Sequence, residues 1–420
     1  MPLMIALVRR VAKAYWTDAG RTAARNLAWL AVLTVVTRLC GLGSVLVLTS
    51  GLGQVTFGIF VTALSLKTYL VLLGSVGVNR ITIRDGSQQL DMIETTRLVI
   101  IGVASVGLFV VSVLVVWWVP MSVAERTLIV LISAGNIAGC LNMRCLFDVQ
   151  HQQPRSEAIT LTTEVAALVA IFVLREFDRL SLPTVGVLFV AKWTFGCLGH
   201  FVVYHTTIRP WRWVASAGHI RQTLRSSWPL MLSALVGTVP LTSGIFFIRW
   251  HDDDNAVAIF GLAQQIAIAY MVSCAIGTRI LQPHIAGPYG MTRSFVKKVI
   301  LFFVLFHSAA LAVAFGATTI IILWVLPPGF QAAVLPVAVL LVGRTVASAA
   351  AIAAMYAVTR YRETLLLRAQ VLSAVLFAGS CLLLVPQGSC LAYAWVSLAA
   401  STCTFLVILW GVRGASRAPV

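Results

Sequence analysis

Residues 98–119 read LVIIGVASVGLFVVSVLVVWWV and contain no charged side chain. A membrane-spanning helix needs about 20 consecutive apolar residues, so this stretch alone is long enough to cross a bilayer. The rest of the chain has the same character. Of its 420 residues, 59% are hydrophobic and only 11% are charged, whereas roughly 25% are charged in soluble domains. The sequence therefore predicts a polytopic membrane protein.

Similar apolar blocks recur along the whole chain and predict an all-α fold with about 12 transmembrane helices. The predicted spans are 26–49, 55–78, 98–119, 127–147, 158–174, 184–205, 228–248, 256–281, 295–325, 333–358, 365–385 and 391–412. The ninth block is long enough to hide a break near Gly316. Twelve helices of about 22 residues leave only short connections, so a soluble catalytic domain has no room.

Basic residues are distributed unevenly between the two sides of this arrangement. The 31 Lys and Arg against 14 Asp and Glu give a formal charge of +17, which on a soluble protein would suggest nucleic-acid binding. Here the basic residues lie between apolar blocks, and most of them fall on one side of the predicted membrane. The other side receives only Arg126, Arg175, Arg179 and Arg249. The positive-inside rule predicts that both termini are cytoplasmic, in a cell inner membrane. No nucleic-acid partner is expected.

The segments between the spans divide the chain into two lobes. A polar, basic linker over 206–227 separates an N-terminal six-helix lobe (26–205) from a C-terminal six-helix lobe (228–412). Residues 1–25 form a basic tail, either an amphipathic segment on the inner leaflet or a solvated extension, and 413–420 form a second cytoplasmic tail.

Side chains that commonly bind metals are scattered. The eight cysteines form no C-x-x-C pair, and the seven histidines form no H-E-x-x-H motif. An acidic cluster at 252–254 contains D-x-D, which holds a metal and a sugar nucleotide in glycosyltransferases. A solvated turn is the other interpretation, and it fits a chain without a nucleotide-binding domain. We therefore expect no metal and no cofactor.

A weak internal repeat relates the two lobes. Ile59, Phe60 and Ala63 in the second span recur as Ile259, Phe260 and Ala263 in the eighth. With six spans in each lobe, a duplication would be parallel and would produce a pseudo-twofold axis along the membrane normal. Transporters commonly place their substrate between two such halves. A chance match between apolar helices remains the alternative.

Several short motifs occur in a characteristic order along the chain. They are Asn-Leu-Ala-Trp at 26–29, Leu-Gly-Gln-Val-Thr-Phe-Gly at 52–58, Gly-Ser-Val-Gly at 74–77 followed by Arg80 and Arg84, Ser-Trp-Pro at 227–229, and Ala-Ile-Phe-Gly-Leu-Ala at 258–263. The second motif resembles the L-G-x-x-x-[FY]-G signature of polysaccharide flippases in the multidrug/oligosaccharidyl-lipid/polysaccharide exporter superfamily. The others resemble that family's span openings and basic turns. Ala258 and Phe260 replace its usual Gly and Tyr.

This resemblance implies a function. It suggests a flippase, not an enzyme, that moves a polyprenyl-diphosphate-linked oligosaccharide across the cytoplasmic membrane by alternating access. The product would be O-antigen (lipopolysaccharide) or exopolysaccharide, and the partners would be membrane lipids, a polysaccharide polymerase and a chain-length regulator. Many relatives carry an acidic residue in the seventh span, whereas residues 242–247 here read Thr-Ser-Gly-Ile-Phe-Phe. Because this chain lacks that acidic residue, we do not expect ion coupling at that position.

Charged side chains inside spans are candidates for the substrate site, because a charge at bilayer depth is unfavourable without a partner or a wet cavity. The candidate cations, in order of preference, are Arg38, Lys67, Lys192, Arg344 and Arg279. Unpaired cations would attract the diphosphate of a lipid-linked sugar. Snorkelling to a headgroup or pairing across helices is the alternative for each. Glu164 is expected either to pair with Lys192 or Arg38, or to couple transport to an ion.

Two other classes of protein remain open from the sequence. A multidrug exporter has a similar fold, but its usual cationic cargo would be repelled by buried Arg and Lys. A polysaccharide polymerase or ligase normally needs a large outer loop, and the longest one predicted here is 175–183. No P-loop or nucleophile elbow supports another enzyme.

Overall fold

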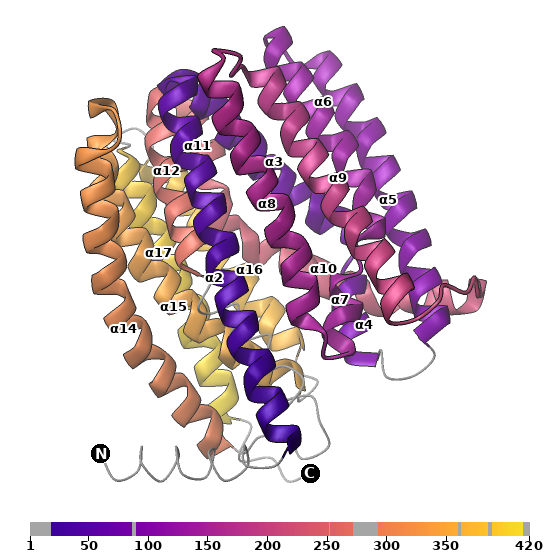
Figure 1. Cartoon of the computed structure of the whole chain (residues 1–420). Helices are drawn as coiled ribbons and strands as arrows, with labels where there is room; N and C mark the ends of the chain where they lie inside the picture. Colours follow the sequence, from indigo (N-terminus) through magenta and orange to yellow (C-terminus); the bar gives the residue numbers. More distant parts are fainter. Residues whose placement is uncertain are drawn as a thin grey trace.

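The computed structural model describes residues 18–85, 90–251, 253–271, 293–359, 363–384 and 389–414, and these form helices without strands (Figure 1). Ten of the described helices are long and apolar enough to cross a membrane, and one bent helix pair adds an eleventh. The predicted eighth span begins on a further helix and continues into residues outside the described ranges. The all-α polytopic fold is confirmed.

The first half of the chain supplies six spans. Its elements are α2 (Asp18–Leu52), α3 (Gln54–Ser75), the short α4 (Val78–Asp85), α5 (Leu90–Trp118), α6 (Val123–Ile137), the 3-10 turn η1 (Ala138–Leu141), α7 (Arg144–Val149), α8 (Gln153–Glu176) and α9 (Leu182–Thr207). Capping boxes begin two of these spans, with Ser122 before α6 and Ser181 before α9. The α2–α3 corner turns at Gly53, whose φ of 75° favours glycine.

The second half has a matching series. Its elements are α10 (Ala217–Thr242), α11 (Gly244–His251), α12 (Asp254–Tyr270), α14 (Arg293–Trp324), the 3-10 turn η2 (Pro328–Ala333), α15 (Val334–Thr359), α16 (Glu363–Leu384) and α17 (Cys390–Gly414). Helix α2 begins and α17 ends at the same end of the bundle, the lower end in Figure 1. We call this the terminal end and the opposite one the far end.

Two predicted spans are interrupted. The fourth one passes from α6 through η1 to α7, and the seventh bends by 49° between α10 and α11. Pro240 lies just before the second break, where its ring and missing N–H weaken the helix. The long ninth block, which could have hidden a break near Gly316, is continuous there, since α14 runs through that residue.

The predicted linker is shorter than expected. Helix α10 begins at Ala217, inside the 206–227 segment, because the Ser216 hydroxyl accepts a hydrogen bond from the His219 N–H and caps the helix. The preceding residues pack on the first half. Arg209 pairs with Asp91 at 2.8 Å, and the Val214 N–H donates to the Thr95 hydroxyl. The second half therefore begins directly after a segment that is bonded to α5 of the first half.

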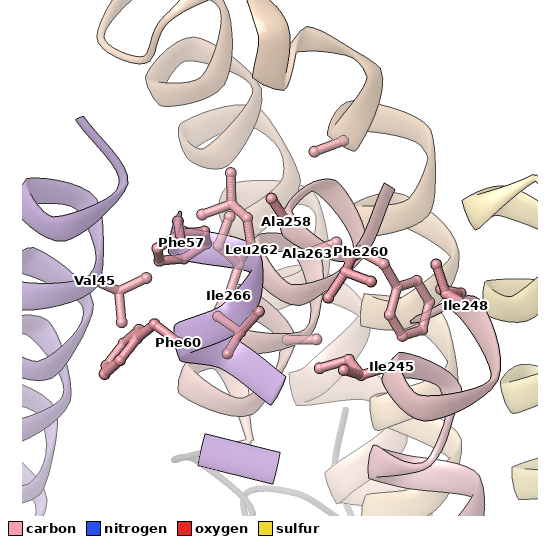
Figure 2. Packing of buried hydrophobic residues seen from close by; sticks show 14 of the residues in the cluster. Val45, Phe57, Phe60, Ile245, Ile248, Ala258, Phe260, Leu262, Ala263 and Ile266 are labelled. Carbon is pink, nitrogen blue, oxygen red and sulfur yellow. The ribbon is translucent and has the colours of Figure 1, made fainter. Parts of the chain in front are cut away.

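The two halves meet where the repeated motif packs against itself. An added Cβ at Gly261 on α12 would lie 2.4 Å from Val61 on α3, and one at Gly58 would lie 2.3 Å from the Asp254 carbonyl. Small residues of this kind let membrane helices approach closely, where van der Waals packing replaces the hydrophobic effect. Phe60 and Phe260, equivalent in the repeat, are both buried in the cluster of Figure 2.

Candidate functional site

The first half holds a group of charged side chains that lie midway along the helices α3, α8 and α9. Lys192 on α9 places its Nζ 3.0 Å from Oε1 and 3.1 Å from Oε2 of Glu164 on α8. Both side chains are less than one-fifth exposed. Glu164 therefore pairs with Lys192, one of the two roles expected for it, and this pair carries no net charge.

Lys67 on α3 lies beside this pair but is held differently. Its Nζ sits 4.4 Å from the ring centroid of Trp193 on α9. Among the described residues Lys67 has no ion-pair partner. A cation–π contact positions an ammonium group without supplying a negative charge to neutralise it. The formal charges of the three side chains sum to one positive charge.

Arg38 lies on the neighbouring helix α2. That helix passes close to the pair, because an added Cβ at Gly41 would be 3.6 Å from Oε2 of Glu164. Arg38 is one helical turn before Gly41 and is exposed, with no ion pair to a described residue. Its guanidinium is therefore open to a ligand or a lipid headgroup, and no carboxylate of the described chain competes for it.

Arg344 on α15 has a backbone partner. Its side chain is 2% exposed, and Nη2 donates to the Leu241 carbonyl at 2.9 Å. Nearby, the Ser397 hydroxyl donates to the Pro240 carbonyl at 2.6 Å. Carbonyls ahead of a helix break lose their helical N–H partners, and these two side chains replace them. The geometry places Arg344 against the α10–α11 bend.

Tyr69 reaches the same bend from the other half of the molecule. Its hydroxyl lies 2.5 Å from the Ser243 Oγ and accepts a hydrogen bond from Thr242 at 2.9 Å. The hydroxyl residues that stand where many relatives carry an acid thus contact α3. This link was not predicted, because nothing in the sequence indicates which helix faces the bend.

A second fully buried arginine was also missed. Arg97 stands directly before the predicted third span, outside it, but α5 begins ahead of this residue and the side chain is only 1% exposed. It donates to Asn79 Oδ1 at 2.9 Å, to the Cys140 carbonyl at 3.1 Å and to the Asn142 carbonyl. Arg97 therefore supports the break at η1 as Arg344 supports the bend. The only sequence feature that could have indicated this role is the position of Arg97 directly before the apolar run at 98–119.

The far end of the bundle is held together across the halves. Arg249 on α11 pairs with Glu125 on α6 and lies 3.7 Å from Asp254. The Gln54 amide donates to the Gly329 carbonyl at 3.3 Å. These contacts join the two halves at the far end.

The acidic cluster is part of this end. Asp253 caps α12, and its hydrogen bond from the Ala256 N–H holds the pKa of that carboxyl below its ordinary value. Asp252 and the candidate Arg279 lie outside the described residues. In the part of the chain that the structure describes, His, Cys, Asp and Glu form no group of three that could hold a metal.

Comparison with known proteins assigns the fold and a family. The family model described as "Polysaccharide biosynthesis protein" matches residues 23–287. The lipid II flippase MurJ in an inward closed conformation is similar with a TM-score of 0.72 and 11% identity, over 91% of this chain and 87% of that one. A point mutant of the Vibrio cholerae MATE transporter VcmN is similar with a TM-score of 0.68 and 13% identity, over 96% and 99%.

A third solved structure is a transporter of the MOP superfamily from Pyrococcus furiosus, described as having a binding pocket of reversed polarity. It is similar with a TM-score of 0.60 and 12% identity, over 94% of this chain and 96% of that one. No curated protein matches the chain. At identities this low, the structural similarity shows the shared fold alone. It is the exporter fold that the sequence motifs predicted.

Proposed function

Because the chain belongs to the polysaccharide biosynthesis protein family, we propose that it is a flippase for a polyprenyl-diphosphate-linked oligosaccharide. Its product would be a surface polysaccharide such as O-antigen or exopolysaccharide. The lipid tail would stay in the bilayer while the headgroup passes between the two halves, and the protein would act as a transporter without catalysing a reaction. The similarity to MurJ, a lipid II flippase, supports this choice of cargo.

One observation carries the proposal. Lys67 is positioned by the Trp193 ring but has no carboxylate partner among the described residues. An ammonium group kept charged at bilayer depth is unfavourable unless an anion or water reaches it. A diphosphate supplies that anion. A cationic drug, the usual cargo of a multidrug exporter, would be repelled by the same group.

The candidate cations would then divide into two roles. We assign the diphosphate contact to Lys67 and Arg38, with Arg279 as a further candidate. Lys192 would hold the local structure through Glu164, and Arg344 would fix the bend of the seventh span. Arginine binds phosphate oxygens bidentately, whereas lysine acts as a point charge, so the two groups would complement each other.

The direction of transport follows from the proposed orientation. The positive-inside pattern favours cytoplasmic termini in an inner membrane, so the far end would face outward. The Glu125–Arg249 and Gln54 contacts would separate for release on that side. Released units would then be consumed by a polymerase with its chain-length regulator.

Deleting the gene tests this function. Lipid-linked repeat units should accumulate where a glycan-modifying enzyme added outside spheroplasts cannot reach them. A strain complemented with the intact gene serves as the control. Units that accumulate within reach of the enzyme would mean that crossing continues without this protein, which would refute the flippase and favour a polymerase or ligase.

A further inference from the structure

A cavity with a mixed polar and apolar lining lies at the terminal end, away from the charged group. Its volume is about 140 Å³. The walls come from α4 and the start of α5 in the first half and from the start of α10 in the second. Figure 1 shows α4 near the lower end of the first half, beside α7. The cavity therefore sits between the halves on the side where the proposed flippase would collect its cargo.

The walls of this cavity present both apolar and polar groups and carry no fixed charge. The polar lining residues are Thr82, Thr96, His219, Gln222, Thr223 and Ser226, and Val78, Ile81 and Ile93 complete the wall. None of them is Asp, Glu, Lys or Arg. Hydroxyl and amide groups both donate and accept hydrogen bonds, so this lining suits a neutral ligand that is itself rich in hydroxyls.

Thr96, in the wall of this cavity, has a buried hydroxyl without a partner in the described structure. Its side chain is 1% exposed and lines the cavity, yet its Oγ1 has no hydrogen-bond partner among the described residues. The adjacent Thr95 hydroxyl, by contrast, accepts from the Val214 N–H. Buried polar groups are nearly always satisfied, and an exception calls for a water or a ligand.

From these features we propose that the cavity binds a sugar ring of the transported oligosaccharide. The proposal rests on the flippase function and adds a second recognition site to it. From Lys67 to the end of α3 at Ser75 the helix rises about 12 Å toward the terminal end. The diphosphate and a sugar would thus be recognised by separate groups, one by charge and one by hydrogen bonds.

This placement also links sugar binding to conformation. The cavity has walls from both halves, so it exists only while α10 stays against α4 and α5. A ligand bound there favours the state that contains the cavity, which is the state that also has the far-end contacts of Arg249 and Gln54. Sugar binding would therefore hold the protein ready to load and would be lost when the halves rearrange.

Protection of an introduced thiol tests the site directly. Ser226→Cys places a thiol in the cavity wall, and Arg221→Cys places one on the exposed side of the same helix. The full-length protein in nanodiscs is labelled with a maleimide. The probe is the oligosaccharide released by mild acid from the cell's lipid-linked pool, which lacks the diphosphate.

At ten times its Kd the probe should slow labelling of Ser226→Cys about tenfold and leave Arg221→Cys unchanged. An unchanged labelling rate at Ser226→Cys would overturn the site. Adding Thr96→Val should raise the half-protecting concentration about threefold to tenfold, while Thr96→Ser retains protection. Equal protection in the Thr96→Val protein would also overturn the assignment.

Different results would refute the flippase function and the sugar site. Protection by the probe together with normal leaflet crossing in the deletion strain would support a sugar site and refute the flippase. Loss of crossing in the deletion strain with no protection would refute only the sugar site. Protein with Lys67→Ala should still be protected by the probe, because the probe carries no diphosphate.

Discussion

The Glu164–Lys192 pair allows a quantitative test of the charged group. At 3.0 Å and an effective dielectric constant of about 20, two unit charges attract by roughly 5 kcal/mol before desolvation is subtracted. Removing one partner of a fully buried pair costs about 3–5 kcal/mol, because a charge is left unpaired. The side chains are 15% and 18% exposed, so we expect about 2–3 kcal/mol for Glu164→Gln or Lys192→Met alone.

The double variant should be far milder. With both charges gone, the loss should be below about 1 kcal/mol, which gives a coupling energy of at least about 3 kcal/mol. Denaturant titration of the purified protein in mixed micelles measures all four free energies of unfolding. Asp91→Asn is the matched control, because the Asp91–Arg209 pair is 21% and 36% exposed and should lose only about 0–1 kcal/mol. If the two single losses simply add in the double variant, the pair is not coupled and the reasoning is wrong.

Three further variants test the contacts between helices. Tyr69→Phe removes the hydroxyl that joins α3 to the α10–α11 bend and should lower the free energy of unfolding by about 1 kcal/mol in the same titration. Arg344→Met leaves the Leu241 carbonyl without its donor and should cost about 1–3 kcal/mol, and an unchanged stability would show that this hydrogen bond is dispensable. Gly261→Ala should cost about 1–3 kcal/mol through its clash with α3, whereas Gly316→Ala, with open space around it, should not destabilise the protein.

The fold was largely predictable because the membrane imposes one strong rule. Spans must be long, apolar and helical, and this pattern is visible in the sequence wherever hydropathy is high. The ends of the helices were harder to place. Helix α5 begins at Leu90, eight positions ahead of the apolar run, because protein groups bond to polar side chains of its first turns such as Thr95 and Arg97. A hydropathy profile contains no information about hydrogen-bond partners that are distant in the sequence.

The candidate site was predictable only as a set of residue types. Lys67, Lys192 and Glu164 were singled out because charges inside spans are rare. Which cation pairs with Glu164 depends on how α3, α8 and α9 face one another. A single sequence does not show how helices face one another. Arg344 shows the same limit, since its partner is a backbone carbonyl exposed by a bend.

Transport by the purified protein tests the central claim most directly. Liposomes containing the protein and lipid-linked oligosaccharide extracted from the deletion strain are treated with a glycan-modifying enzyme that cannot enter them. Without transport, only units in the outer leaflet react. The account predicts that nearly all units become reactive with the intact protein, and that Lys67→Ala combined with Arg38→Ala returns the yield to the protein-free value. An intact protein that leaves the inner-leaflet units unreactive, or a double variant that transports normally, would contradict it.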